Sequence, residues 1–409
     1  MHSNSSDVIV IGGGPCGSFT ALNLAKQGCN VKVFEEHGKI GVPCHCAGHL
    51  SLVGLKRLGL HPLPSEITES TYYGAIFHSP KGRKFRIRCW SPVTCSVNRA
   101  LFDEYIAGLA EDAGAKYLLG SPVESLVTKE GSVKGVVASH QGSVENFLAK
   151  LVVDAEGVSS RILKQTGLFT STCYMLVKAV EMEVKNVEDL EKDMVEIFLG
   201  REYAPGLYAW LMPKKNDGEA KVGLAAERGN PKQLLERLML KHPVASKKLR
   251  KAKITHTAFH SIPLGGPISK TYSDGFMVVG DAASQVKSTT GGGVILGMTC
   301  GKIAAETAYE ALLRNEFSSY SLQAYQKRCE ETLGAETRFM LRIRNMLNNL
   351  PDHKLDDIID FCAKISLERT LQNLNDVDFQ RGILLRTLLN PRMFLAFFYF
   401  LFSYFHVKH

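Results

Sequence analysis

The chain has 409 residues, of which 45% are hydrophobic and 22% are charged, and its formal net charge is +8. This composition is typical of a folded globular protein with room for two or three domains, and it excludes a disordered or low-complexity chain. The modest positive charge permits contact with an anionic surface but gives no indication of nucleic acid as a partner.

The ten cysteines are scattered along the chain rather than arranged in a ladder. Residues 1–7 are polar, so the sequence predicts no secretory signal. A long chain without such a signal is expected in a reducing compartment with free thiols. We therefore expect a cytoplasmic protein.

The stretch DVIVIGGGPCGSFTALNLAKQGCNVKVFEE predicts a strand, a turn, a helix and a second strand. Residues 8–11 have the β-branched character of a buried parallel strand, and residues 18–27 suit a helix. Between them, Gly12, Gly14 and Gly17 have the spacing GxGxxG. In a dinucleotide-binding turn the first glycine allows the tight turn, the second admits the pyrophosphate, and the third permits close helix–strand packing.

Two further features of this segment concern the ligand. Pro15 and Cys16 lie inside the glycine turn, so we expect them to contact the nucleotide too. Glu35 closes the second strand 23 residues after Gly12, where a carboxylate accepts hydrogen bonds from a ribose hydroxyl. That carboxylate disfavours a 2′-phosphate, so FAD or NAD is expected rather than NADP, while a purely structural glycine turn is the alternative.

The stretch GFMVVGDAASQVKSTTGGGVILGMTCGKIAAETA, residues 275–308, decides between FAD and NAD. Its apolar strand ends in Gly280 and Asp281, and a second glycine-rich turn precedes a long helix. Together with the first turn, it resembles the second FAD motif of the p-hydroxybenzoate hydroxylase-like flavoproteins. The resemblance implies that the cofactor is FAD and that Asp281 binds its ribityl chain. It also implies that Gly292, Gly293 and Val294 begin a helix directed at the isoalloxazine ring, where the positive helix end stabilises negative charge.

Three more positions fit the same superfamily. Arg99 stands in the Arg-x-x-Phe-Asp setting in which the arginine contacts the flavin nucleotide, although a surface helix with an ion pair would look the same. Val123 follows AKYLLGSP and matches the position whose backbone faces the adenine. Residues 151–162, LVVDAEGVSSRI, resemble the third motif, in which Glu156 replaces the usual aspartate.

The stretch IGVPCHCAGHLS, residues 40–51, narrows the family. Geranylgeranyl reductases carry Pro-x-x-Cys and a glycine-containing turn here, which Pro43, Cys46 and Gly48 match. Many members continue Cys-Gly-acid, and that acidic position is absent here. The resemblance implies that Cys46, Ala47 and Gly48 contact the flavin. A zinc site would lack the usual second ligand pair, so no metal is predicted, whereas a disulfide between Cys44 and Cys46 or inert packing stays open.

A second local motif, YAWLMPK, contains Tyr208, Trp210 and Pro213. It resembles the family's Tyr-x-Trp-x-Phe-Pro motif on the sheet that faces the substrate, with Met212 in place of Phe. Plain core packing of the two aromatic residues is the alternative. With both motifs, the chain is identified as a member of the geranylgeranyl reductase family, similar to the archaeal digeranylgeranylglycerophospholipid reductases.

This membership implies an FAD-dependent reductase that saturates C=C bonds of geranylgeranyl chains in membrane lipids or their precursors. Reduced flavin N5 would deliver a hydride and a second group a proton, for which Cys46 and then Tyr208 are the catalytic candidates. The reductant would be NAD(P)H or a ferredoxin. A monooxygenase of the same fold and a quinone-linked electron-transfer flavoprotein are the rival interpretations.

The expected fold is α/β. A Rossmann-like FAD-binding domain with a parallel sheet takes residues 1–70, 96–170 and 260–330, and an antiparallel-sheet substrate domain takes 71–95 and 171–259. Residues 331–409 are expected to form a helical C-terminal region.

The C-terminal region contains MFLAFFYFLFSYF, residues 393–405, which is too short to span a bilayer. It is expected to be a buried helix, a wall of the prenyl tunnel or a segment lying in the membrane interface. The basic cluster at 247–253 is either a solvated face or a contact for anionic head groups. We therefore expect a peripheral contact with a membrane surface.

Overall fold

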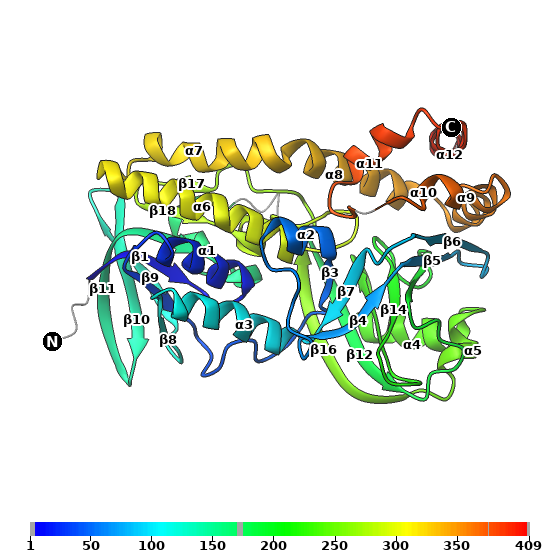
Figure 1. The fold of residues 1–409 in the computed structure, drawn as a ribbon, viewed down its shortest axis with the longest axis horizontal. Coiled ribbons are helices and arrows are strands. Elements are labelled where there is room, and N and C mark those ends of the chain that lie inside the picture. The colour runs from blue at the N-terminus through cyan, green and yellow to red at the C-terminus, as the bar shows by residue number, and fades with distance from the viewer. Residues whose placement is uncertain (1–4, 170–174, 375, 407–409) are drawn as a thin grey trace. The chain divides into compact units, whose positions relative to one another are not determined.

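The chain folds around two large β-sheets, one mainly parallel and one mainly antiparallel (Figure 1). The computed structural model describes residues 5–169, 175–374 and 376–406, which form two units. Unit 1 contains the described residues of Met1–Cys44, Arg99–Met175 and Pro263–Thr337. Unit 2 contains those of His45–Asn98, Leu176–Ile262 and Arg338–His409.

Unit 1 is built on a sheet with the strand order β17-β18-β11-β1-β2-β8. Strand β1 pairs in parallel with β11 and β2, while β18 and β8 continue the parallel arrangement on either side. Strands β10 and β9 extend from β11 as an antiparallel ribbon. The bounds are β1 Ser5–Ile11, β2 Val31–Phe34, β8 Lys116–Leu118, β9 Val123–Lys129, β10 Ser132–His140, β11 Ser143–Asp154, β17 Tyr272–Ser273 and β18 Phe276–Val278.

The helices of unit 1 pack closely because small residues stand where they meet. A Cβ added at Gly297 would lie 2.4 Å from Cys16 Sγ, and one added at Gly301 would lie 2.5 Å from Thr20 Oγ1. Helix α6 can therefore lie against α1, which brings the turn after β1 beside the turn after β18. The bounds are α1 Pro15–Ala25, α3 Arg99–Asp112, α6 Val294–Arg314 and α7 Ser319–Cys329, with short helical turns η1 Gly157–Ser159, η2 Leu163–Thr166, η3 Gly280–Ala283 and η4 Glu330–Gly334.

Unit 2 contains a sheet with the strand order β16-β12-β15-β14-β13-β5-β6 and a small antiparallel sheet ordered β3-β7-β4. In the larger sheet, β13 and β5 pair in parallel, whereas β12, β15, β14 and β13 follow one another antiparallel. The bounds are β3 His49–Ser51, β4 Thr68–Tyr72, β5 Gly74–His78, β6 Lys84–Arg88, β7 Thr94–Val97, β12 Leu176–Lys185, β13 Met194–Phe198, β14 Ala209–Pro213, β15 Ala220–Ala226 and β16 Lys253–Pro263.

Helices pack on both faces of the larger sheet in unit 2, with α4 and α5 on one face and α9 and α10 against Phe77, Phe85 and Ile87 on the other. The bounds are α2 Leu52–Arg57, α4 Pro231–Lys241, α5 Ala245–Leu249, α9 Asp352–Lys364, α10 Glu368–Leu371, α11 Gln380–Thr387 and α12 Pro391–Phe405, while α8, Ala335–Asn349, begins in unit 1. Alternate residues of β15, such as Val222 and Leu224, pack with Leu235 and Leu238 of α4. Because side chains alternate along a strand, Lys221 and Gly223 point to the opposite face.

These sheets confirm the expected fold class, with a parallel sheet in one part of the chain, an antiparallel sheet in another, and helices toward the C-terminus. The boundaries of the functional domains stay a prediction. Unit 2 includes residues 45–70, which the sequence interpretation placed with the FAD-binding domain, and residues 338–409, which it placed in a separate region.

Helix α12 coincides with the apolar segment 393–405. One side packs in unit 2, where Met393 and Ala396 are buried and the Tyr399 ring stacks on Phe361 at 4.2 Å. Its opposite side is exposed. Among the described residues, no single helix is long and apolar enough to cross a membrane, and α11 with α12 meets that requirement only as a pair bent by 118°.

His242 of unit 2 is buried in a form that must stay neutral. Its Nε2 lies 3.0 Å from the Ser79 carbonyl oxygen, while the backbone N–H groups of Val244 and Ala245 donate to Nδ1 at 3.2 and 3.3 Å. A proton on Nδ1 would displace both donors. Burial lowers the pKa of His242 from 6.5 to about 4.

This burial predicts a loss of stability in acid. Between pH 6.5 and about 4, His242 is protonated in the unfolded chain but neutral in the folded protein. The contribution of His242 to the unfolding free energy is therefore complete above pH 6.5 and falls as the pH drops. In His242→Gln, which cannot titrate but can still donate to the Ser79 carbonyl, the loss of unfolding free energy between about pH 7.5 and about pH 5 should be about 2 kcal/mol smaller than in the wild type.

Urea unfolding followed by tryptophan fluorescence measures this difference in the right part of the chain, because both tryptophans, Trp90 and Trp210, lie in unit 2. Equal losses in the two proteins would contradict the assignment of the acid sensitivity to His242.

Candidate functional site

The turn between β1 and α1 shows that its glycines serve different purposes. Gly12 has φ +98°, and a Cβ there would lie 2.5 Å from the Ala155 carbonyl oxygen. A Cβ at Gly17 would lie 2.0 Å from the Gly12 oxygen. At Gly14, by contrast, a Cβ would meet no described atom within 4 Å. The protein's own backbone requires Gly12 and Gly17, whereas Gly14 leaves an open cradle at the helix N-terminus, as a pyrophosphate requires.

Glu35 lies against the same turn. Its Oε2 accepts a hydrogen bond from the Gly13 N–H at 2.8 Å, and its Oε1 accepts one from the His37 N–H at 2.9 Å. The Oε1 atom also lies 2.6 Å from His37 Nδ1. A carboxylate has about four lone-pair sites, so Glu35 retains acceptor capacity for a ribose hydroxyl. The contact of His37 with Glu35 was not predicted from the sequence. The position of His37 two residues after Glu35 could have indicated it.

The second glycine turn lies beside the first within unit 1. Gly280 has φ +70°, and a Cβ there would lie 3.0 Å from Cys16 Sγ of α1. A Cβ at Gly293 would lie 2.8 Å from Asp281 Oδ1, so the backbone that starts α6 passes directly over the Asp281 carboxylate. Asp281, Gly292, Gly293 and Val294 are thus gathered at the N-terminus of α6, whose positive end is turned toward this turn.

Cys16 contributes to this arrangement through packing. Its sulfur fills the contact between α1 and α6, and burial, together with the nearby Asp281 carboxylate, raises the pKa of its thiol. The side chain therefore stays a neutral thiol inside the helix contact. Pro15 beside it occupies the first turn of α1, where the missing N–H has no consequence.

Arg99 and Val123 are placed on different elements of unit 1. Arg99 makes a two-point contact with Asp103, with Nε to Oδ1 at 3.1 Å and Nη2 to Oδ2 at 3.0 Å. The ion pair considered as an alternative is therefore present, and nucleotide contact by Arg99 stays a prediction. Val123 begins β9 and is buried, just after Ser121, whose N–H donates to the Glu35 carbonyl at 2.8 Å.

Glu156 has a structural role that explains the departure from the third motif. Its Oε1 accepts hydrogen bonds from the N–H groups of Ile162 and Leu163 at 2.8 and 3.0 Å, and its Oε2 accepts one from the Arg161 N–H at 2.8 Å. These donors start the helical turn η2, so Glu156 caps it, and the shorter aspartate side chain would reach less far. Burial and the charge of Glu156 raise the pKa of the neighbouring Asp154.

The predicted substrate motif lies on the face of the unit 2 sheet that α4 does not cover. Glu181 of β12, Gly223 of β15 and Trp210 of β14 stand in one row across the three strands. A Cβ at Gly223 would lie 2.5 Å from Trp210 Cζ2, so this glycine makes room for the indole. The indole Nε1–H donates to Glu181 Oε2 at 3.2 Å, and the Tyr208 ring lies 6.1 Å away, edge to face.

The remaining residue of the motif, Pro213, ends β14. Its carbonyl oxygen accepts a hydrogen bond from the Tyr72 hydroxyl at 2.8 Å. Tyr72 in turn packs with Met212 and Val195 and with the partly buried Trp210 and Ala47. The turn that contains Cys46 and the Tyr208–Pro213 strand are therefore joined through Tyr72 and Ala47.

Residues 46–48, here called the 46–48 turn, belong to unit 2 and are attached to it at several points. Gly48 has φ +72°, and its carbonyl oxygen accepts a hydrogen bond from the Val97 N–H at 2.9 Å. The Ala47 carbonyl oxygen lies 3.2 Å from Lys221 Nζ. Cys46 is a partly exposed thiol next to these two anchored residues. Its contact with flavin stays a prediction.

The remaining residues of the cysteine- and histidine-containing stretch have separate surroundings. His45 stacks on His260 at 6.2 Å, and His49 Nε2 lies 2.8 Å from the Thr94 hydroxyl. The Cys44 thiol is exposed. Within the described residues, no group of three or more histidine, cysteine, aspartate or glutamate side chains is arranged to hold a metal ion.

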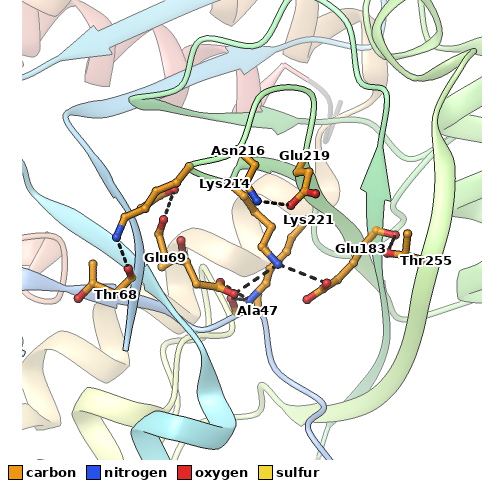
Figure 2. Close-up of polar contacts among 12 residues, drawn as sticks. Ala47, Thr68, Glu69, Glu183, Lys214, Asn216, Glu219, Lys221 and Thr255 are labelled. Atoms are coloured by element: carbon orange, nitrogen blue, oxygen red, sulfur yellow. Dashed lines mark hydrogen bonds and ion pairs between the residues drawn. The ribbon is translucent and has the colours of Figure 1, made fainter. Parts of the chain in front are cut away.

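Unit 2 contains a cluster of charged side chains that was not predicted from the sequence (Figure 2). Lys221, only 4% exposed, pairs with Glu69 at 2.8 Å, and Lys214 pairs with Glu69 and Glu183 at 3.4 and 3.3 Å. Burial raises the pKa of Glu181 to about 7. Two features of the sequence could have indicated this cluster: a lone lysine in the apolar strand AKVGLAA and two glutamates in the strand sequence VEMEV.

Comparison with known proteins identifies the family. Residues 5–338 match the model of the FAD binding domain family. The chain is 32% identical to the digeranylgeranylglycerophospholipid reductase 2 of Methanopyrus kandleri, covering 93% of this chain and 96% of that protein. It is 35% identical to the protein of the same name from Methanothermobacter thermautotrophicus, covering 90% and 96%.

Solved structures agree with this result. A geranylgeranyl bacteriochlorophyll reductase-like protein from Thermoplasma acidophilum superposes with a TM-score of 0.85 at 26% identity, over 94% of this chain and 96% of that one. The flavin-dependent brominase Bmp2, with a TM-score of 0.70 at 19% identity over 91% and 94% of the two chains, shares the fold alone.

The open cradle at Gly14, the Glu35 carboxylate and the second turn at Asp281 fit the cofactor that the family model names. FAD is therefore the cofactor of this protein. The chain belongs to the FAD binding domain family and, within it, to the family of the digeranylgeranylglycerophospholipid reductases.

Proposed function

We propose that the protein is an FAD-dependent reductase that saturates C=C bonds of geranylgeranyl chains in glycerophospholipids or their precursors. The observation that carries the proposal is the identity of 32–35% to reductases of this name over at least 90% of the chain. The structure of unit 2 supports it, because the 46–48 turn lies on the aromatic sheet face that contains Tyr208 and Trp210.

When bound and reduced, FAD supplies a hydride. The glycine turns and Glu35 of unit 1 hold the nucleotide, and Cys46 or Tyr208 holds the proton that the second alkene carbon needs. Burial raises the pKa of the Tyr208 hydroxyl, which keeps it protonated and able to donate at neutral pH. The partly buried Trp210, which packs on the buried Tyr72 and Met212, offers an apolar ring to a chain that has no hydrogen-bonding groups.

The electron donor, NAD(P)H or a ferredoxin, stays a prediction. A monooxygenase of the same fold would consume oxygen and add an oxygen atom to its product, whereas a quinone-linked flavoprotein would leave the prenyl chain unchanged. Anaerobic incubation of the chemically reduced protein with a geranylgeranyl lipid tests the proposal, with mass spectrometry of the lipid as the readout. A gain of two hydrogens per saturated bond is expected, and an unchanged lipid would overturn the proposal.

Helix α12 is proposed to touch the membrane that contains the lipid. Phe394, Phe398, Phe402 and Phe405 are 47–60% exposed on one side of this helix, and Leu389 just before it is 95% exposed. Exposed aromatic side chains of this kind partition into the interface of a bilayer. The basic cluster at 247–253 contributes less than its composition suggests, because Lys248 is buried against Glu196 at 3.1 Å and Lys251 pairs with Glu188.

The cradle predicts that Gly14→Ala weakens FAD binding without unfolding unit 1. The added Cβ meets no described atom within 4 Å, and φ at Gly14 is −68°, so only the pyrophosphate would be obstructed. FAD affinity should fall by at least about tenfold, or about 1.4 kcal/mol, in a titration of the apoprotein. Gly108→Ala on α3, also in open space, is the matched control and should bind FAD normally. Equal affinities in the two variants would contradict the role of Gly14.

The catalytic role of Cys46 predicts a selective loss of activity. With FAD bound, Cys46→Ala should reduce the lipid at least about a hundredfold more slowly, as expected when a positioned proton donor is removed. Cys44→Ala, which alters the exposed thiol two residues earlier, should react at the wild-type rate. Initial rates of lipid saturation measure both. A wild-type rate in Cys46→Ala would refute the role of this thiol.

Membrane contact by α12 predicts that replacing Phe394, Phe398 and Phe402 together by Gln lowers binding to anionic vesicles by at least about tenfold, because three apolar side chains no longer enter the interface. Vesicle flotation provides the measurement. Replacement of Leu240 and Leu313 by Gln, at positions 74% and 70% exposed on other helices, serves as the control and should have no effect. If the α12 variant floats as well as the wild type, the contact lies elsewhere or does not exist.

A further inference from the structure

We propose that Lys221 is a positioning residue that holds the 46–48 turn, and with it Cys46, against the aromatic sheet face of unit 2. The role in turnover rests on the proposed function, whereas the tie between Lys221 and the turn does not. Neither the family motifs nor the comparisons assign a role to this lysine.

The tie runs from the Lys221 ammonium to the Ala47 carbonyl oxygen (Figure 2). Lys221 is the second residue of β15 and lies opposite Glu183 of β12 and Met212 of β14. Its ammonium nitrogen lies 3.2 Å from the Ala47 carbonyl oxygen and 2.8 Å from Glu69 Oε2. Since the side chain is only 4% exposed, water competes little for its three donors.

The charge of Lys221 is maintained by its neighbours. Burial opposes the charged form, but the carboxylates of Glu69 and Glu181 hold the pKa of Lys221 above its ordinary value. A buried ammonium is tolerated only when acceptors surround it, and here one of those acceptors is the backbone of the turn. The carboxylates thus keep Lys221 in the form that can donate to Ala47.

The tie acts at one point of the turn and leaves the others intact. Gly48 is held independently by the Val97 N–H, and the Ala47 side chain packs with Tyr72 and Met212. Loss of the Lys221 ammonium would therefore free the Ala47 peptide group next to Cys46 without releasing the strand that follows. The expected consequence is a less well oriented thiol, because small displacements of a reacting group lower its rate markedly.

Glu181 connects the same cluster to the predicted substrate motif. It accepts the Trp210 indole N–H at 3.2 Å, and its charge also acts on Lys221. The titratable and charged groups that interact with Glu181 are Lys221, Glu183 and Glu69. One network thus extends from the turn to Trp210, which ties the orientation of Cys46 to that of the aromatic face.

The chain provides a matched control within this network. Lys214 has the same charge, and its nitrogen pairs with the carboxylates of Glu69 and Glu183 at 3.4 and 3.3 Å. The hydrogen bond to the Ala47 carbonyl oxygen, by contrast, comes from Lys221. Lys214→Met and Lys221→Met therefore each remove one positive charge from the cluster, but only the second removes the hydrogen bond to Ala47.

Amide hydrogen exchange of the full-length, FAD-loaded protein tests the tie. In Lys221→Met, the peptide that contains residues 46–48 should exchange at least about threefold faster, because one of its anchors is gone. In Lys214→Met it should exchange as in the wild type. Equal exchange in the wild type and Lys221→Met, or an equal increase in both variants, would overturn the proposal. If unpaired Glu69 prevents Lys221→Met from folding, Lys221→Met combined with Glu69→Gln gives the same comparison.

Steady-state kinetics of lipid saturation separate positioning from a merely structural effect. With FAD content unchanged, Lys221→Met should lower kcat by at least about tenfold and leave KM within about twofold, since the thiol acts after the lipid has bound. Lys214→Met should change neither constant. A wild-type kcat in Lys221→Met would overturn the positioning role. If the wild type saturates no lipid, the proposed function fails, and hydrogen exchange still decides whether Lys221 holds the turn.

Discussion

A buried ammonium needs acceptors on every side, and this requirement shapes the sheet face of unit 2 that contains Trp210. Lys221 lies near the start of an otherwise apolar strand and is buried, and burying its charge without partners would cost several kcal/mol. Glu69 provides one acceptor and the Ala47 carbonyl oxygen another, so a strand of the small sheet and the 46–48 turn meet at the larger sheet. The same face carries Trp210 above Gly223, where a larger residue would displace the indole.

Unit 1 depends on a constraint of a different kind, the close approach of backbone to backbone. Gly12 and Gly17 are fixed by contacts inside the protein, and Gly297 lets α6 lie on Cys16 of α1. Because these contacts bring the two glycine turns together, the space in front of Gly14 stays open for the cofactor. The residues predicted to bind FAD are thus arranged by packing, while the residues proposed to act on the lipid are arranged by buried charge.

Much of unit 1 could be predicted from the sequence because its signals are local. A strand, GxGxxG, a helix and an acid at the end of the next strand identify the turn at Gly14 and the place of Glu35 without knowledge of the rest of the chain. The parallel and antiparallel sheets followed in the same way from strand patterns. The role of Glu156 could not be predicted, because it depends on three N–H groups that lie five to seven residues further along a turn of unknown shape.

The cluster around Lys221 lay beyond sequence reasoning for a physical reason. Glu69, Glu181 and Lys221 are up to about 150 residues apart. The register of β12 and β15 places Glu181 and Lys221 on one face, and Glu69 comes from β4 of the small sheet. For α12, an apolar composition on every side left a buried helix and a membrane contact open, and the structure shows a helix packed on one side and exposed on the other.

If the proposed function is right, the reduced protein passes its electrons to an isolated alkene. Anaerobic stopped-flow mixing of the fully reduced protein with a geranylgeranyl glycerophospholipid tests this transfer most directly, with flavin absorbance as the signal. We predict that oxidised flavin returns without oxygen, at one equivalent per double bond saturated. Flavin that stays reduced until oxygen is admitted would contradict the proposed function.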